Sequence, residues 1–132
     1  MDNIKNDNYY IKKVLDNIDA IIKYTKDLCF DEFINDALVI DAVMFRLIQM
    51  TENISHISRE FKEKHINIEW GKIAGFRNGI VHDYGKTDFT IVYEIVSNDV
   101  YKLKTEFLKW NSLIKTCSRL GVNNGICRCK TL

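Results

Sequence analysis

Proline is absent from the sequence, and only six glycines occur among its 132 residues. Three of those glycines, Gly85, Gly121 and Gly125, lie at a turn or late in the chain. Because these two residue types are the strongest breakers of regular structure, their scarcity favours a helical fold. The length fits one domain, and 46% hydrophobic residues are enough to bury a core.

An excess of charge of either sign is also missing, because 19 Lys and Arg residues face 18 Asp and Glu residues. A strongly basic chain would indicate nucleic-acid binding from composition alone, so any contact with RNA must be local to a site. No run of about 18 apolar residues occurs, which excludes a membrane-spanning helix. Residues 1–8 are polar and of mixed charge, unlike a secretory signal, and we therefore expect a cytoplasmic protein.

Cysteines spaced in pairs for a structural metal are absent as well. Cys127 and Cys129 are separated by a single residue, and Cys117 lies upstream. Structural zinc sites instead use two Cys-x-x-Cys-like pairs or their histidine equivalents. We expect no metal and no cofactor, and we interpret the four cysteines as free thiols in a reducing compartment. His56 and His65 are expected on the surface, without a metal role.

Apolar residues recur at steps of three and four in four segments, the pattern of amphipathic helices. These segments are residues 7–29, 31–61, 68–83 and 88–115. We expect Asp31 and Asp88 to be N-caps and Gly85 to end the third helix. Short connections make successive helices antiparallel, so the sequence predicts an all-α, up-and-down bundle of four or five helices. Residues 1–115 then form one helical domain, and residues 116–132 form a loosely ordered tail with little apolar period.

The second predicted helix carries two apolar stripes. One stripe contains Ile34, Leu38, Phe45 and Ile48, and the other contains Phe33, Ala37, Ile40, Met44, Leu47 and Ile54. One stripe suits the core of a single chain, whereas a second is typical of a helix that also packs on another chain. A central helix buried within one bundle explains the same pattern, so the sequence leaves both arrangements open.

Polar and ionisable side chains gather in residues 75–86. Asn78 and His82 are four residues apart and therefore share one helix face, and Arg77 and Tyr84, seven apart, also align. Arg77 and His82 lie about 140° apart around an ideal helix. They converge only through the long Arg side chain or by meeting a second copy of the chain across a dimer.

These residue types suit RNA cleavage by attack of a ribose 2′-OH on the neighbouring phosphate. The reaction needs a base near neutral pH, where His titrates with an ordinary pKa of about 6.5. The planar Arg fork matches phosphoryl oxygens that gain negative charge, and Asn can orient the phosphate or the imidazole. Tyr can donate to a phosphate or stack on a base. The carboxylate cluster of a two-metal nuclease is lacking. A structural helix end, with His82 as a C-terminal cap, is the alternative.

Arg77 and Asn78 are followed by His82 after three intervening residues and by Tyr84 after one more. This spacing resembles the Arg-Asn-x-x-x-His-x-Tyr signature of HepT-like HEPN domains. Further matches to this family, within residues 9–115, are Trp70, residues 73–76, residues 46–49, Glu52-Asn53 and Asp88. One departure is Gly79, which stands where the family often has a larger or charged residue.

The resemblance implies a four- or five-helix bundle that forms a homodimer in which the two Arg-x4-His motifs face each other. It implies a metal-independent endoribonuclease toxin of a type II-like or type VII-like toxin–antitoxin module, with RNA as substrate. Arg77 and His82 would be catalytic, and Asn78 would support them. The partner would be an MNT-type nucleotidyltransferase antitoxin that adds AMP to Tyr84 and so silences the toxin.

Two other functions remain open on the sequence. A non-catalytic HEPN subunit that docks a nucleotidyltransferase and binds nucleotide fits the near-neutral net charge. A purely structural helical dimer fits the two stripes of the second predicted helix. Glu52 either lines the cleft or is an ordinary solvated side chain, and we favour the solvated interpretation.

Overall fold

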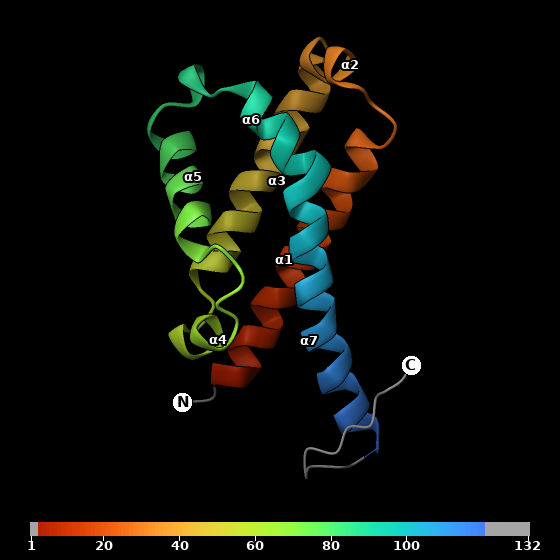
Figure 1. The fold of residues 1–132 in the computed structure, drawn as a ribbon, viewed down its shortest axis with the longest axis vertical. Helices are drawn as coiled ribbons and strands as arrows, with labels where there is room; N and C mark the ends of the chain where they lie inside the picture. Colours follow the sequence, from red (N-terminus) through yellow and green to blue (C-terminus); the bar gives the residue numbers. More distant parts are fainter. Residues whose placement is uncertain (1–2, 121–132) are drawn as a thin grey trace.

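The computed structural model describes residues 3–120, whereas residues 1–2 and 121–132 lie outside this description. Every regular element within the described residues is helical, which confirms the predicted all-α class. Four long segments run alternately up and down within this part of the chain (Figure 1). They are α1 (Asn3–Thr25), α3 (Ala37–Ser55), α5 (Trp70–His82) and a run made of α6 (Phe89–Glu94), the π-helical turn η2 (Ile95–Asp99) and α7 (Val100–Leu120). They are connected by α2 (Phe30–Ile34), α4 (Arg59–Lys64) and the 3-10 turn η1 (Tyr84–Lys86).

The prediction of a single helix over residues 31–61 is wrong, because this stretch folds as α2, α3 and α4. The Asp36 carboxylate accepts a hydrogen bond from the Val39 N–H at 3.1 Å, and α3 begins there. The Ser58 hydroxyl accepts one from the Phe61 N–H at 3.1 Å, and α4 begins there. Each cap satisfies a backbone donor that a helix start leaves without a partner, so new helices begin without help from glycine or proline.

Two further predicted helix ends differ from the structure. Asp31 lies in the first turn of α2 and is not its N-cap, which is Cys29. The Cys29 N–H donates to the Glu32 carboxylate at 3.0 Å, and this hydrogen bond lowers the pKa of Glu32. At the end of α5, the N–H of the C-cap Asp83 donates to a carbonyl one turn back, so Gly85 lies beyond the helix end, in η1.

The last helical run agrees with the sequence at its start. Asp88 is the N-cap of α6, as predicted, and its carboxylate accepts a hydrogen bond from the Thr90 N–H at 2.9 Å. Its end differs, because α7 continues past residue 115 to Leu120. The remainder of the predicted tail, including Cys127 and Cys129, lies outside the described residues. No helix in the described part of the chain is both long and apolar enough to cross a membrane.

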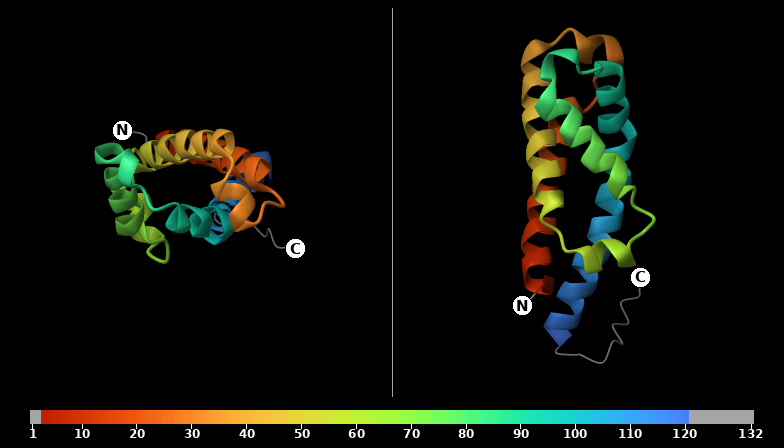
Figure 2. Two further views of the ribbon diagram at one scale, coloured as in Figure 1. Left: turned by 90° about the horizontal axis from the view of Figure 1, so that it is seen from above. Right: turned by 90° about the vertical axis from the view of Figure 1, so that its left-hand side faces the viewer.

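The core forms around α3, with α1 and α5 packed against α3 and α7 packed against α1 (Figure 2). Completely buried side chains in this core include Ile11, Ile18, Phe33, Val43, Leu47 and Phe107. The large residues of one predicted stripe, Phe33, Ile40, Met44, Leu47 and Ile54, are all buried. Leu38 and Phe45 of the other stripe are 80% and 55% exposed and face outward from the bundle, whereas Ile48 of this stripe is partly buried against the core.

Helix α5 is fixed at both ends, and this determines where its polar residues lie. The Trp70 indole N–H donates to the carbonyls of Lys62 and His65, at 3.1 Å each, and ties the start of α5 to the end of α4. The Trp70 ring also packs against Phe107 of α7. Ile80, 3% exposed, anchors the last turns of α5 in the core. One side of α5 is therefore held against the bundle.

A groove of about 920 Å³ separates α5 from α6 and α7. Its lining is largely apolar and includes Leu47 from α3, Phe76 from α5 and Leu103 from α7. Because α3 is the main neighbour of α5, the far side of α5 is left uncovered by the described part of the chain.

Candidate active site

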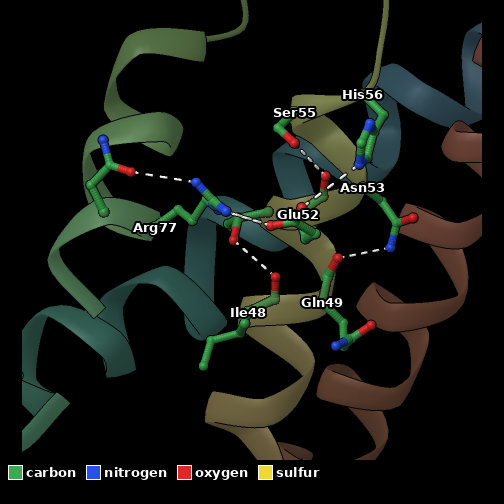
Figure 3. Close-up of polar contacts among 9 residues, drawn as sticks. Ile48, Gln49, Glu52, Asn53, Ser55, His56 and Arg77 are labelled. Carbon is green, nitrogen blue, oxygen red and sulfur yellow. Dashed lines mark hydrogen bonds and ion pairs between the residues drawn. The ribbon is translucent and has the colours of Figure 1, made fainter. Parts of the chain in front are cut away.

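Arg77 leaves α5 on the side that faces α3. Its Nε and Nη2 atoms both donate to Glu52 Oε1, at 3.0 and 2.6 Å, and Nη1 lies 3.5 Å from Asn78 Oδ1 (Figure 3). The Arg77 side chain is 34% exposed. Because Glu52 binds one edge of the planar guanidinium, the edge that carries Nη1 can still receive an anion.

Glu52 joins two helices and two basic side chains. Besides Arg77, its Oε2 atom lies 3.7 Å from Nε2 of His56, the C-cap of α3. The solvated interpretation favoured for Glu52 is therefore wrong, although the side chain remains 46% exposed. Ion pairs this open to water contribute only about 0–1 kcal/mol to stability. The main effect of Glu52 is to fix the direction of the Arg77 side chain.

His82 lies in the last turn of α5 and is exposed, as is Asn78 one turn earlier. Among the described residues, none forms a hydrogen bond or an ion pair with the His82 imidazole. Arg77 is turned toward Glu52, so the structure does not bring Arg77 and His82 together within one chain. The short polar connection between Arg77 and Asn78 is present.

Tyr84 begins η1, directly after the C-cap Asp83 of α5. Because α5 ends at His82, the helical spacing that was predicted to align Tyr84 with Arg77 does not extend to Tyr84. The Tyr84 side chain lies outside what the structure describes, and its role stays a prediction.

The other two histidines differ in their surroundings. His56 is exposed, as predicted, and its ring stacks on Tyr10 with centroids 5.0 Å apart. Tyr10 in turn meets Tyr9 edge-on, also at 5.0 Å. For His65 the surface prediction is wrong, because the ring stacks on Phe61 at 4.1 Å and is partly buried. The spacing of Tyr9 and Tyr10 relative to His56 depends on how α1 packs on α3, so the sequence alone did not reveal this aromatic cluster.

The site is chemically a mixed-charge cluster. Among the side chains that the structure describes, no group of three or more His, Cys, Asp or Glu residues is placed to hold a metal ion. Arg77 offers N–H donors to an anion, and His82 offers an imidazole that solvent reaches. These are an anion-binding group and a proton-transfer group at two places along one helix.

Comparison with known proteins gives one family. The family model described as "Ribonuclease HepT-like" matches residues 14–109. A candidate RNase of Methanocaldococcus jannaschii is 33% identical over 97 residues, which cover 74% of this chain and 89% of that protein. A second candidate RNase of this organism is 31% identical over 100 residues, or 76% and 86% of the two chains. The "Probable ribonuclease HepT" of Thermococcus cleftensis is 29% identical over 100 residues, or 76% and 91%. No solved structure gives a significant match.

Proposed function

The chain belongs to the Ribonuclease HepT-like family, and we propose that it is a metal-independent endoribonuclease toxin in which Arg77 and His82 act on RNA. The observation that carries this proposal is the state of Arg77, which Glu52 orients along one edge while the other edge, with Nη1 at 3.5 Å from Asn78 Oδ1, keeps N–H donors that Glu52 does not use. Such a guanidinium is ready to bind a phosphate in a fixed direction.

In the proposed reaction, the neutral His82 imidazole accepts the proton of a ribose 2′-OH. The 2′ oxygen forms a bond to the adjacent phosphorus, the bond from phosphorus to the 5′ oxygen breaks, and the leaving 5′ oxygen takes a proton from a second imidazolium or from water. The products are a 2′,3′-cyclic phosphate end and a 5′-hydroxyl end. Arg77 stabilises the charge that collects on the non-bridging oxygens, and Asn78 orients the phosphate.

We propose a homodimer because one chain holds the two proposed catalytic groups on different sides of α5. The outer side of this helix carries Asn78, Gly79 and His82, which are all exposed, and the adjacent Val81 is 57% exposed. A Cβ atom added at Gly79 would meet nothing within 4 Å. A second copy can therefore approach this side of α5 closely, and the proposed dimer brings the α3-facing edge of its own α5, which carries Arg77, to His82.

The proposed regulator is an MNT-type nucleotidyltransferase antitoxin that transfers AMP to Tyr84, in a type II-like or type VII-like cytoplasmic module. Tyr84 lies two residues beyond His82, in the turn that follows α5. A phosphodiester at Tyr84 would add negative charge and bulk near the position proposed for the RNA phosphate, and both oppose RNA binding.

A second candidate is a non-catalytic subunit that docks a nucleotidyltransferase and binds nucleotide. The specific observation in its favour is that Glu52 already neutralises Arg77 in a chain whose net charge is only +1. This candidate predicts tight binding of the transferase and no RNA cleavage.

A growth experiment tests the proposed function and its regulation together. Inducible expression of the wild-type chain in a bacterial host should stop growth, whereas His82→Ala and Arg77→Ala should not, at equal protein levels. Co-expression of the cognate transferase should restore growth for the wild type but not for Tyr84→Phe, which retains the ring and lacks the acceptor oxygen. Normal growth with unmodified wild-type protein present would contradict the toxin proposal.

A further inference from the structure

A second groove lies on the other face of α3, between α3 and α1, with a volume of about 390 Å³. We name it the α1/α3 groove. Helix α1 contributes Tyr9, Lys13, Asp16 and Asn17 to its lining. Helix α3 contributes Phe45, Arg46, Gln49 and Asn53. We propose that the α1/α3 groove binds the single-stranded part of an RNA that flanks the cleaved bond, an inference that rests on the proposed ribonuclease function.

Two exposed aromatic rings lie in the α1/α3 groove, each with a cation over it. Tyr9 is 57% exposed, and the Lys13 ammonium lies 5.5 Å from its ring centroid. Phe45 is 55% exposed, and the Arg46 guanidinium lies 5.8 Å from its ring centroid. Single strands of RNA are held by aromatic side chains that stack on bases and by cations that follow the phosphates. Both components are present here.

Arg46 is held in the groove by neutral oxygens. It donates to Asn17 Oδ1 at 3.2 Å and to the Tyr24 hydroxyl at 3.5 Å, and neither partner cancels its charge. The acidic residue of the lining, Asp16, lies 3.5 Å from the Lys12 ammonium, which offsets its charge. The groove is therefore a local positive region in a chain that is nearly neutral as a whole, as the sequence required of any RNA contact.

A row of contacting side chains leads from the α1/α3 groove to Arg77. Asn53, in the lining, directly follows Glu52, which binds Arg77 and lies 3.7 Å from His56 (Figure 3). The His56 ring stacks on Tyr10, and Tyr10 meets Tyr9 of the groove. Phe45 and Glu52 are separated by about 10 Å along α3, from the helical rise of about 1.5 Å per residue. This distance suits a short flanking segment rather than a long duplex.

The chemistry of the lining favours RNA over a second copy of the chain as the occupant. The centre of a protein–protein interface is depleted of charged residues. The α1/α3 groove instead contains Lys13 and Asp16, which belong to the depleted types, beside the amides of Gln49 and Asn53, which can meet the edges of bases.

Binding of a labelled, single-stranded oligonucleotide with 2′-O-methyl riboses tests this inference without cleavage, because the attacking hydroxyl is blocked. Phe45→Ala should weaken binding by about fivefold or more, the low end of what one stacked base contributes. Lys13→Ala should also weaken binding and lower its dependence on salt, because it removes a cation that follows the phosphates. Lys23→Ala and Leu38→Ala are matched controls, since both side chains are exposed on the same helices outside the groove. The controls should bind like the wild type.

Sedimentation and cleavage of unmodified RNA, measured on the same proteins, separate the outcomes. Equal binding by all four variants would overturn the groove inference, even if the wild type cleaves RNA. Phe45→Ala could lose both binding and the dimer while Lys13→Ala binds normally. This result would make the groove a contact between subunits and would also overturn the inference that it binds RNA. If Lys13→Ala and Phe45→Ala alone lose binding while the wild type cleaves no RNA, the groove inference is supported and the proposed ribonuclease activity is contradicted.

Discussion

The Nη2 atom of Arg77 lies 2.6 Å from Glu52 Oε1, and the Nε atom of this guanidinium lies 3.0 Å from that oxygen. One carboxylate oxygen thus accepts two hydrogen bonds from one edge of the Arg77 fork. The contact links α5 to α3 at the point where the proposed catalytic motif begins. Glu52 is accordingly proposed as a positioning residue for Arg77.

Glu52→Ala should lower kcat for RNA cleavage by roughly tenfold to a hundredfold, because a mispositioned catalytic group loses rate steeply. Glu52→Gln, which keeps a carbonyl acceptor, should recover part of this loss. The free energy of unfolding of both variants should lie within about 1 kcal/mol of the wild-type value, since the ion pair is exposed. Glu69→Ala, which removes an exposed carboxylate 3.4 Å from Lys72, is the control. An unchanged kcat in Glu52→Ala would remove the positioning role.

Mixing two inactive variants should restore activity if the catalytic groups meet across a dimer. Arg77→Ala and His82→Ala should each be inactive alone. A mixed dimer retains one intact Arg77 from one chain and one intact His82 from the other, so refolding the two together should recover cleavage. Each variant refolded with itself is the control. If the mixture stays inactive while mixed dimers are demonstrated by mass, the two groups do not work across the interface.

Gly79→Ala should stabilise the isolated chain by about 0.5–1 kcal/mol, because alanine is the better residue within a helix. The new methyl group meets nothing within 4 Å in one chain. If a second copy packs on this side of α5, the methyl group should nevertheless weaken the dimer and lower cleavage. Thermal unfolding at low concentration and sedimentation at high concentration measure the two effects. A more stable variant with an unchanged dimer would place the interface elsewhere.

Asp7→Ala should destabilise the fold by about 1–3 kcal/mol, the cost of leaving buried donors without an acceptor. Asp7 is 4% exposed, and its carboxylate accepts hydrogen bonds from the Ser58 N–H at 2.8 Å and the Ser58 hydroxyl at 2.7 Å. These bonds tie α1 to the start of α4. Asp19→Ala, which removes an exposed carboxylate 2.9 Å from Lys104, should cost less than about 1 kcal/mol in the same urea titration. Equal losses in the two variants would contradict this difference.

The sequence predicted the parts of the fold that depend on local pattern. The apolar period located α5 to within two residues at its start and one at its end, and Asp88 marked the start of α6 because its side chain caps the next turn. The breaks at Asp36 and Ser58 were missed, because apolar residues continue in helical spacing across them and neither proline nor glycine is present. Cap residues alone are a weak signal in such a stretch.

The sequence predicted which residues of one segment belong to the candidate site, but not their contacts with residues elsewhere in the chain. Arg77, Asn78 and His82 were recognised from their spacing, but the partnership of Arg77 with Glu52 joins residues 25 positions apart and requires the packing of α5 on α3. The α1/α3 groove depends in the same way on how α1 lies against α3. No periodicity within one helix contains that information, since it describes only which residues share a face.

His82 is proposed as the catalytic base of an RNA-cleaving site, and its replacement tests this role most directly. Wild-type protein and His82→Ala should be incubated with a structured RNA in EDTA, with circular dichroism confirming that both are folded and intact mass confirming that Tyr84 is unmodified. His82 is exposed, so its replacement should leave the fold unchanged. We predict cleavage by the wild type alone, with 2′,3′-cyclic phosphate ends on the products. Equal cleavage by the two proteins would contradict the catalytic role of His82, and no cleavage by either would contradict the proposed ribonuclease activity.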